Sequence, residues 1–157
     1  MSSAGGCTES DTVRRPRVYV DTDVLLAAAA STSGASHLII KLSELTLIEG
    51  VISEAVRVEA ERNLVAKLPH ALPAYRAFLK SAKLREIPLP SPDEMKLYHG
   101  QADPKDLPHL VAACLSGCQY LVTHNTKDYA PNPGSVEVLT PGEFLQRIRE
   151  QLARLAP

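Results

Sequence analysis

Short apolar runs alternate along the chain with longer stretches in which apolar residues recur every three or four positions. Residues 18–20 form an apolar run that ends at an acid, which predicts a short buried strand. Residues 46–52 are rich in β-branched side chains and predict a second strand. Between these two runs, residues 25–30 predict the start of one helix, and residues 36–45 predict another helix with a single apolar face.

The same alternation continues through the rest of the chain. The remaining predicted helices cover residues 54–68, 72–83, 92–99, 103–114 and 141–155, and the remaining predicted strands cover residues 85–89, 119–123 and 136–139. Ser53 is expected to cap the first of these helices, and Pro69 is expected to end it. Residues 140–143 have the pattern of a capping box with proline at the first helical position, which marks the start of the last helix.

Strands that alternate with helices are typical of an α/β fold with a mostly parallel sheet. A chain of 157 residues is long enough for one such domain, and we expect that domain to occupy residues 17–157. Residues 1–16 are small, polar and charged, which predicts a disordered tail.

Composition excludes several classes of protein. Lysine and arginine total 17, and aspartate and glutamate total 18, so the net charge of −1 is unlike that of a polycationic nucleic-acid coat. Aromatic residues make up 4% of the chain, too few for a base-stacking platform. No apolar run approaches the roughly 20 residues of a membrane helix, and the N-terminus has no apolar segment typical of a secretory signal. Three cysteines without paired spacing argue against a disulfide scaffold, so we expect a cytoplasmic protein.

Acidic and amide side chains gather where the predicted strands end. Asp21 and Asp23 follow the first strand, and Asn125 and Asp128 follow the strand of residues 119–123. In an open parallel sheet, sites lie beyond the carboxyl ends of the strands. Carboxylates that converge there repel one another unless a cation binds or their pKa values rise, and hard divalent cations prefer oxygen ligands. The sequence therefore predicts a metal-dependent site for phosphoryl transfer or phosphodiester hydrolysis.

Further acids could join that site from two helices. Asp103 and Asp106 open the helix that precedes the strand of residues 119–123, and Glu59 lies on the helix that follows the second strand. At about 100° per residue, Glu59 lies about 160° around its helix from Glu61. The residues closest to Glu59 in angle around the helix are alanines, whose small side chains let other segments approach closely. We therefore expect Glu59 to be the buried glutamate of that helix.

These acids also have purely structural explanations. Asp21 could cap the next helix, and Asp103 could cap the helix that follows it. Asp106 would then lie in the first turn of that helix, where its negative charge interacts favourably with the helix dipole. Asp128 could be a turn residue before the nearby prolines. The cysteines and histidines show no zinc-ligand spacing, and we expect His124 to form local hydrogen bonds rather than act as a base.

Motifs in this order resemble a known family. They include VYVDTDVLL at residues 18–26, DPKDLP at residues 103–108 and YLVTHNTKDY at residues 120–129, with further similarity at residues 52–64 and 139–145. Over about residues 17–146, the chain resembles the PIN-domain ribonucleases of the VapC-type toxins. That family implies a three-layer α/β/α fold with a five-stranded, mostly parallel sheet. It also implies three or four acids that hold Mg²⁺ or Mn²⁺ and hydrolyse single-stranded RNA.

The resemblance assigns roles to particular residues. Asp21 matches the first acid, Glu59 the second and Asp106 the third, while Thr123 matches the hydroxyl residue at the end of the fourth strand. Asn125 stands where many members have a fourth acid. The expected supporting residues are Thr22, Asp23, Asp103 and Thr123.

Two positions depart from the usual pattern of the family. Some members carry asparagine at position 125 and an acid three residues later, as Asp128 does here, so Asn125 and Asp128 are alternative metal ligands. Position 23 is aspartate where asparagine or serine is usual, which adds a further charge to the site.

The resemblance implies a Mg²⁺- or Mn²⁺-dependent endoribonuclease, the toxin of a toxin–antitoxin pair or a relative of one. Asp21, Asp106 and either Asp128 or Asn125 would bind the metal, and Glu59 would complete the site or position the attacking water. A PIN fold whose site has lapsed would instead be a binding module, an alternative that the asparagine at position 125 supports. The segment of residues 21–23 also resembles the opening motif of HAD-type phosphatases, although no later strand ends in the paired acids of that family.

RNA, an antitoxin protein and a second copy of the chain are the expected partners. Apolar positions on two helices, Leu42 and Leu45 on one and Phe78 and Leu79 on the other, predict a homodimer. Basic residues that could contact phosphates are Arg14, Arg15, Arg17, Arg57, Arg62, Lys105 and Lys127.

Overall fold

The structure is a computed structural model that describes residues 15–131 and 133–156. Within these residues, five strands form one sheet in the order β3-β2-β1-β4-β5, and every pairing is parallel. The strands are β1 (Arg17–Val20), β2 (Glu49–Ser53), β3 (Arg85–Ile87), β4 (Tyr120–Val122) and β5 (Glu137–Leu139). The predicted α/β fold is confirmed, and the sheet is entirely rather than mostly parallel.

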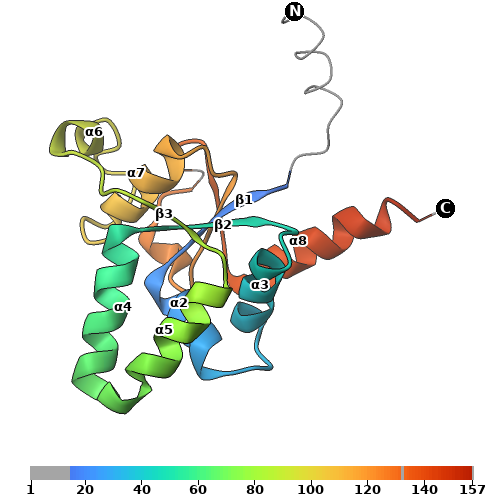
Figure 1. Cartoon of the computed structure of the whole chain (residues 1–157). Helices are drawn as coiled ribbons and strands as arrows, with labels where there is room; N and C mark the ends of the chain where they lie inside the picture. The colour runs from blue at the N-terminus through green and yellow to red at the C-terminus, as the bar shows by residue number, and fades with distance from the viewer. Residues whose placement is uncertain (1–14, 132, 157) are drawn as a thin grey trace, which may run out of the picture.

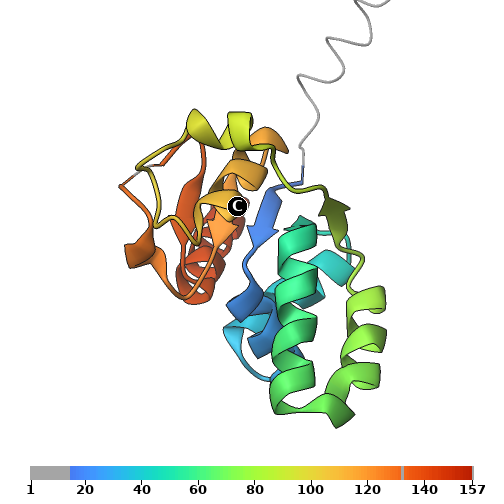
Figure 2. The same cartoon turned by 90° about the vertical axis from the view of Figure 1, so that its left-hand side faces the viewer.

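Helices cover both faces of the sheet. They are α2 (Thr22–Ala30), α3 (Ala35–Glu44), α4 (Glu54–Lys67), α5 (Leu72–Ser81), α6 (Pro92–Lys96), α7 (Leu107–Leu115) and α8 (Pro141–Ala153), with 3₁₀ turns η1 (Pro69–Ala71) and η2 (Thr126–Asp128). Figure 1 shows α6 and α7 on one side of the sheet and α2, α3, α4 and α5 on the other. Helix α8 packs against α3, and α4 and α5 lie side by side (Figure 2). The molecule therefore has the three layers that were expected.

The central strands β1 and β4 anchor the core. Residues 18–20 of β1 and residues 121–122 of β4 are completely buried, as expected for parallel strands that helices cover on both faces. From β1 the chain moves outward to β2 and β3, and it then returns to β4 on the other side of β1. The order of strands thus reverses between β1 and β4, and such a switch point opens a crevice at the carboxyl ends of the strands.

Three of the element boundaries that differ from the prediction have clear local reasons. Helix α2 begins at Thr22 rather than residue 25, because Asp21 already caps it. Strand β2 begins at Glu49 rather than residue 46, because Thr46 has a φ of 60° and lies in a turn. Helix α7 begins at Leu107 rather than residue 103, so that Pro108 falls in the first turn, where its missing N–H costs no helical hydrogen bond.

The two predicted capping motifs have different outcomes. Thr140 accepts a hydrogen bond from the Glu143 N–H, and the Glu143 side chain accepts one from the Thr140 N–H, so the predicted capping box is confirmed. Ser53 stands before α4, but its hydroxyl caps nothing, and the Tyr19 hydroxyl donates to it instead at 2.7 Å. Ser53 therefore occupies the predicted N-cap position but makes no capping hydrogen bond with its side chain.

Two residues before β1 contact the segment that leads into β2. The Pro16 carbonyl accepts a hydrogen bond from the Glu49 N–H at 2.8 Å, and the Arg15 guanidinium donates to the Thr46 carbonyl at 3.4 Å. Both residues were expected in the disordered tail. Residues 1–14 of the expected tail, with Arg14, lie outside the described residues.

No single helix among the described residues is long and apolar enough to cross a membrane. Helices α2 and α3 reach the required length and composition only as a pair, and the two are bent by 94° at their junction. Both helices contribute residues to the core, among them Leu25 and Ile39, which are completely buried.

Candidate active site

Asp21 lies where β1, β4 and α2 meet. Its backbone N–H continues the β1–β4 ladder by donating to the Val122 carbonyl at 3.1 Å. Its side chain is almost fully buried: Oδ1 accepts a hydrogen bond from the Thr22 N–H at 2.7 Å, and Oδ2 accepts one from the Thr123 hydroxyl at 2.8 Å. Asp21 is therefore the cap of α2 and, at the same time, an acid fixed at the switch point.

A cleft of about 510 Å³ opens at this edge of the sheet. Six of the residues expected at the site line it: Asp21, Thr22, Asp23, Glu59, Asp106 and Asn125. His109, Asn63, Lys67 and Lys105 also line it. Asp103, Thr123 and Asp128, which were also expected at the site, lie outside this lining. Residues from β1, α2, α4, α7 and the segment after β4 are thus brought together.

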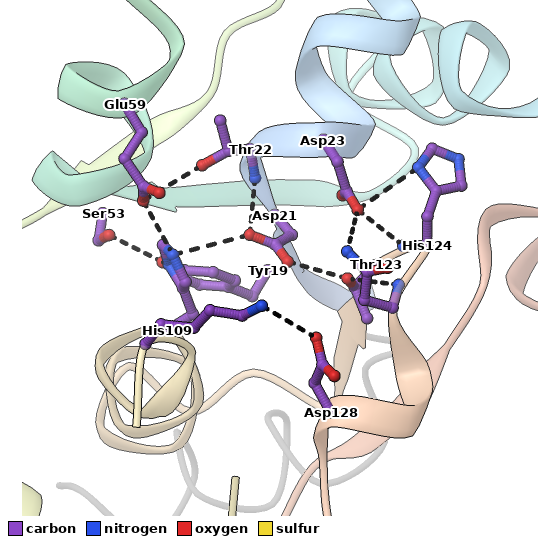
Figure 3. Close-up of polar contacts among 12 residues, drawn as sticks. Tyr19, Asp21, Thr22, Asp23, Ser53, Glu59, His109, Thr123, His124 and Asp128 are labelled. Atoms are coloured by element: carbon purple, nitrogen blue, oxygen red, sulfur yellow. Dashed lines mark hydrogen bonds and ion pairs between the residues drawn. The ribbon is translucent and has the colours of Figure 1, made fainter. Parts of the chain in front are cut away.

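A buried histidine joins Glu59 to Asp21 (Figure 3). His109 Nε2 lies 3.0 Å from Glu59 Oε1 and 3.7 Å from Asp21 Oδ1. On the other side of the ring, Nδ1 lies 2.8 Å from the Tyr19 hydroxyl, which donates to Ser53. In this arrangement both ring nitrogens act as donors, which is the hydrogen-bonding pattern of an imidazolium.

The pKa shifts of this pair agree with an ion pair. Burial lowers the pKa of His109, but the hydrogen bond to Glu59 and the negative charges of Asp21 and Glu59 outweigh it, so the pKa is raised overall. The hydrogen bond from His109 in turn lowers the pKa of Glu59. The Glu59 side chain is 43% exposed, so the expectation of a buried glutamate is wrong. Its helical phase still points it into the cleft.

Asp106 precedes α7 but does not cap it. Its side chain makes no capping hydrogen bond, and Oδ2 is buried without a partner among the described residues. Burial, together with the negative charges of Asp21 and Asp128, raises the pKa of Asp106 to about 6. Asp103 accepts a hydrogen bond from the Lys105 N–H at 3.1 Å in the turn before the helix. The helix cap predicted at Asp103 is therefore wrong, and Asp106 stands at the N-cap position of α7 rather than inside its first turn.

Asp23, in the first turn of α2, reaches across to the segment after β4. Its Oδ2 accepts hydrogen bonds from the His124 N–H and from Asn125 Nδ2, both at 3.2 Å. His124 Nδ1 lies 3.6 Å from the same oxygen, which agrees with the local role expected for this histidine. Burial and the nearby charge of Asp21 raise the pKa of Asp23, although His124 partly offsets them. The other oxygen, Oδ1, is buried without a partner among the described residues.

Asp128 lies in η2, at the edge of the site. Its Oδ2 is 3.8 Å from Lys105 Nζ. Its carbonyl accepts a hydrogen bond from the Asp103 N–H at 2.7 Å, which ties η2 to the segment before α7. The carboxylate is near enough to raise the pKa of Asp106, yet it does not line the cleft.

The donor set fits a hard divalent cation. In the part of the chain that the structure describes, no three His, Cys, Asp or Glu side chains are already arranged to hold a metal ion. However, two buried carboxylate oxygens that accept no hydrogen bond there, Asp23 Oδ1 and Asp106 Oδ2, belong to acids with raised pKa values. Repelling carboxylates of this kind are stabilised by a cation, and Mg²⁺ and Mn²⁺ prefer such oxygen ligands.

Only some of the basic residues reach the site. Of the basic residues expected to contact phosphates, Lys105 lines the cleft, and Arg62 lines an adjoining depression that shares Lys105 and Glu59. Lys67, which was not among them, also lines the cleft. Other basic side chains that were expected to contact phosphates are held elsewhere: Arg17 by Glu49 and Arg57 by Glu86.

His109 is the site residue that the sequence analysis missed. It is the only basic side chain of α7 and comes three residues after Asp106, a spacing that places both on one helix face. That spacing is a signal that could have been used. Tyr19 gave no comparable signal, because a tyrosine in a buried strand is usually a core residue.

Comparison with known proteins assigns the chain to a family. The PIN domain family matches residues 17–127, so the chain belongs to the PIN-domain family. It shares its fold with VapBC2 from Rickettsia felis bound to a DNA fragment from their promoter, with a TM-score of 0.60 and 16% identity over 78% of this chain and 96% of that chain. PAE2754 from Pyrobaculum aerophilum has a TM-score of 0.62 and 19% identity over 86% of this chain and 90% of that chain. No curated protein matches the sequence significantly.

Proposed function

We propose that this protein is a Mg²⁺- or Mn²⁺-dependent endoribonuclease that hydrolyses phosphodiester bonds of single-stranded RNA. The observation that carries the proposal is the buried Asp21 at the switch point of a PIN-domain sheet, with Glu59 and Asp106 facing the same cleft. Membership of the PIN-domain family supports a nuclease rather than a HAD-type phosphatase.

The acids of the cleft would have two different roles, metal binding and positioning of the attacking water. Asp21 and Asp106 would hold the cation, with Asp128 or Asn125 as the further ligand predicted from the family. When bound, a divalent cation lowers the pKa of a coordinated water and neutralises charge on the phosphate. Glu59, which lies 3.0 Å from His109 Nε2, would orient the attacking water and accept its proton.

The supporting residues fix the acids, and the basic residues attract the substrate. Thr123 donates to Asp21, and Thr22 Oγ1 lies 3.4 Å from Glu59 Oε1, so each hydroxyl restrains one carboxylate. Lys67, Lys105 and Arg62 lie beside the acids, where they would bind the phosphates on either side of the cleaved bond.

The proposed biological role is that of a toxin, or a relative of one, with an antitoxin protein as partner. The shared fold with a chain of VapBC2 supports this assignment. We also propose that two copies of the chain pair in the cytoplasm.

Asp21→Asn tests the proposed activity. The amide oxygen can still accept the hydrogen bond from the Thr22 N–H, so the variant should fold. With Mn²⁺ or Mg²⁺, the parent protein is expected to cleave the single-stranded regions of RNAs in a panel of structured substrates. The variant is expected to show only the background cleavage that the parent protein shows in EDTA.

Other outcomes of this experiment separate the alternatives. Equal cleavage by a folded Asp21→Asn protein would contradict the nuclease assignment. RNA binding without cleavage under every metal condition would support a lapsed binding module. A phosphoryl mimic trapped covalently on Asp21 would support the phosphatase.

A further inference from the structure

Asp23 offers the cleft a carboxylate oxygen that nothing in the described chain satisfies. Its Oδ2 is fixed by two donors, the His124 N–H and Asn125 Nδ2, so the carboxylate cannot rotate freely. Its Oδ1 is buried without a hydrogen-bond donor, and Asp23 is part of the cleft lining. Leaving a buried carboxylate oxygen unsatisfied is costly, so such an atom in a cleft points to a bound partner.

Asn125 is oriented to serve Asp23 rather than a cation. A carboxylate oxygen only accepts hydrogen bonds, so the Asn125 amide must turn its NH₂ group toward Asp23 Oδ2, as the 3.2 Å contact shows. A cation needs the oxygen end of the amide, which this hydrogen bond turns away from Asp23. Asp128, the other alternative, faces Lys105 and does not line the cleft.

We propose that Asp23, held in place by Asn125, is a ligand of the divalent cation. This inference rests on the proposed metal-dependent activity and names a ligand on α2 in place of Asn125 or Asp128. Asp21, Asp23 and Asp106 all line the same cleft, so the three carboxylates lie around one space. Asn125 is then a positioning residue: its hydrogen bond to Oδ2 fixes the orientation of the Asp23 carboxylate at the cleft.

Asp23→Asn is a sharp test because it changes one atom. The amide oxygen of the variant can still accept from the His124 N–H and from Asn125, while the unsatisfied Oδ1 is replaced by an NH₂ group that cannot bind a cation. Calorimetric titration of Mn²⁺ alone into the metal-free variant should show an affinity at least about tenfold lower than that of the parent protein. Mutation of residues that only support a metal ligand already weakens metal binding by about this factor. The melting temperature without metal should not fall.

Asp128→Asn is the matched control, because it removes the same charge from the edge of the site. It should change Mn²⁺ affinity by less than about threefold if Asp23 is the ligand, since Asp128 lies against Lys105 and does not line the cleft. Asn125→Ala should weaken Mn²⁺ binding by an intermediate factor, because it frees the Asp23 carboxylate without removing it.

Each outcome decides a separate question. Equal Mn²⁺ affinity in Asp23→Asn and the parent protein overturns the inference. Asp23 would then only join α2 to the segment after β4 through its hydrogen bonds. Equal losses in Asp23→Asn and Asp128→Asn also overturn it, since charge rather than ligation would then explain the effect. A parent protein that binds no Mn²⁺ overturns the proposed function together with the inference.

Discussion

The pKa values of the acids around the cleft are shifted in opposite directions because their neighbours differ. Glu59 faces the imidazole of His109, which lowers its pKa, whereas Asp106 faces other carboxylates, which raise its pKa to about 6. One acid is thus held charged, and the other takes up a proton near neutral pH unless a cation is bound. Two experiments on single residues test this division.

Glu59→Gln is expected to slow RNA cleavage by about 10²-fold or more, the usual contribution of a positioned base. The reason is that Glu59 lies in the cleft on His109, whereas Glu54, at the start of the same helix, is exposed and lines only the adjoining depression. Initial rates at saturating Mn²⁺ for Glu59→Gln and the control Glu54→Gln check this. Similar rates for the two variants would show that the helix face was assigned wrongly.

Asp106→Asn is expected to stabilise the metal-free protein at neutral pH. The folded state raises the pKa of Asp106 from 3.8 to about 6, so the protonated acid favours folding and this contribution is lost as the pH rises through 6. The asparagine side chain of this variant carries no charge at any pH, so its contribution does not change with pH. Thermal unfolding in EDTA should therefore show a gain in melting temperature that grows from about pH 4 to about pH 6 and then levels off. A gain that is constant over this range would contradict the argument.

At the scale of elements, close packing between β2, α3 and the start of β3 requires a glycine. A Cβ atom at Gly50 would lie 2.5 Å from Leu84 Cδ2 and 2.8 Å from Ser43 Oγ. Ser43 cannot easily move away, because its hydroxyl donates to the Ala82 carbonyl at 2.9 Å. The absence of a side chain at Gly50 is therefore what lets these elements pack together.

Gly50→Ala is expected to lower the free energy of unfolding by about 1–3 kcal/mol, the usual cost of overpacking a core. Urea unfolding followed by circular dichroism measures this change. Gly142→Ala, in the first turn of α8, is the control, because its added Cβ meets nothing within 4 Å. A loss of the same size in both variants would rule out the contact with Leu84 as its cause.

At the scale of the molecule, the apolar surface bears on the expected dimer. Of the four positions that predicted it, Leu42, Phe78 and Leu79 pack against the core, and Leu45 is 57% exposed. Leu47, two residues further on, is exposed to the same extent. The end of α3 therefore keeps an apolar surface, whereas the predicted face on α5 is largely used within the molecule.

The dimer prediction can be tested at that surface. Light scattering of the parent protein at micromolar concentrations should give the mass of two copies, and Leu45→Glu should give the mass of one, because a buried unpaired charge is costly at an interface. Leu97→Glu, at the C-terminal end of α6, is the control. A parent protein that is monomeric over this range would refute the prediction.

Hydrophobic periodicity was sufficient for the architecture. The apolar runs at residues 18–20 and 119–123 became the two central strands, since a run that helices cover on both faces has to be apolar throughout. Because parallel strands end at one edge, the position of Asp21 and Asp23 directly after β1 already placed them at the crevice. Helix boundaries were less predictable, because a cap such as Asp21 or a proline such as Pro108 shifts a boundary by several residues.

The sequence by itself thus determined the order of the elements, the α/β class and the edge at which the acids gather, because these follow from local patterns and chain direction, whereas the three layers were expected from the family resemblance. Only the tertiary structure decided which side chains face one another there. Glu59, His109 and Tyr19 come from three different elements, and no local pattern links them. The same holds for the hydrogen bond from Asn125 to Asp23, which are 102 residues apart in the chain. Contacts of this kind depend on how helices pack across a sheet, and packing is a property of the folded chain.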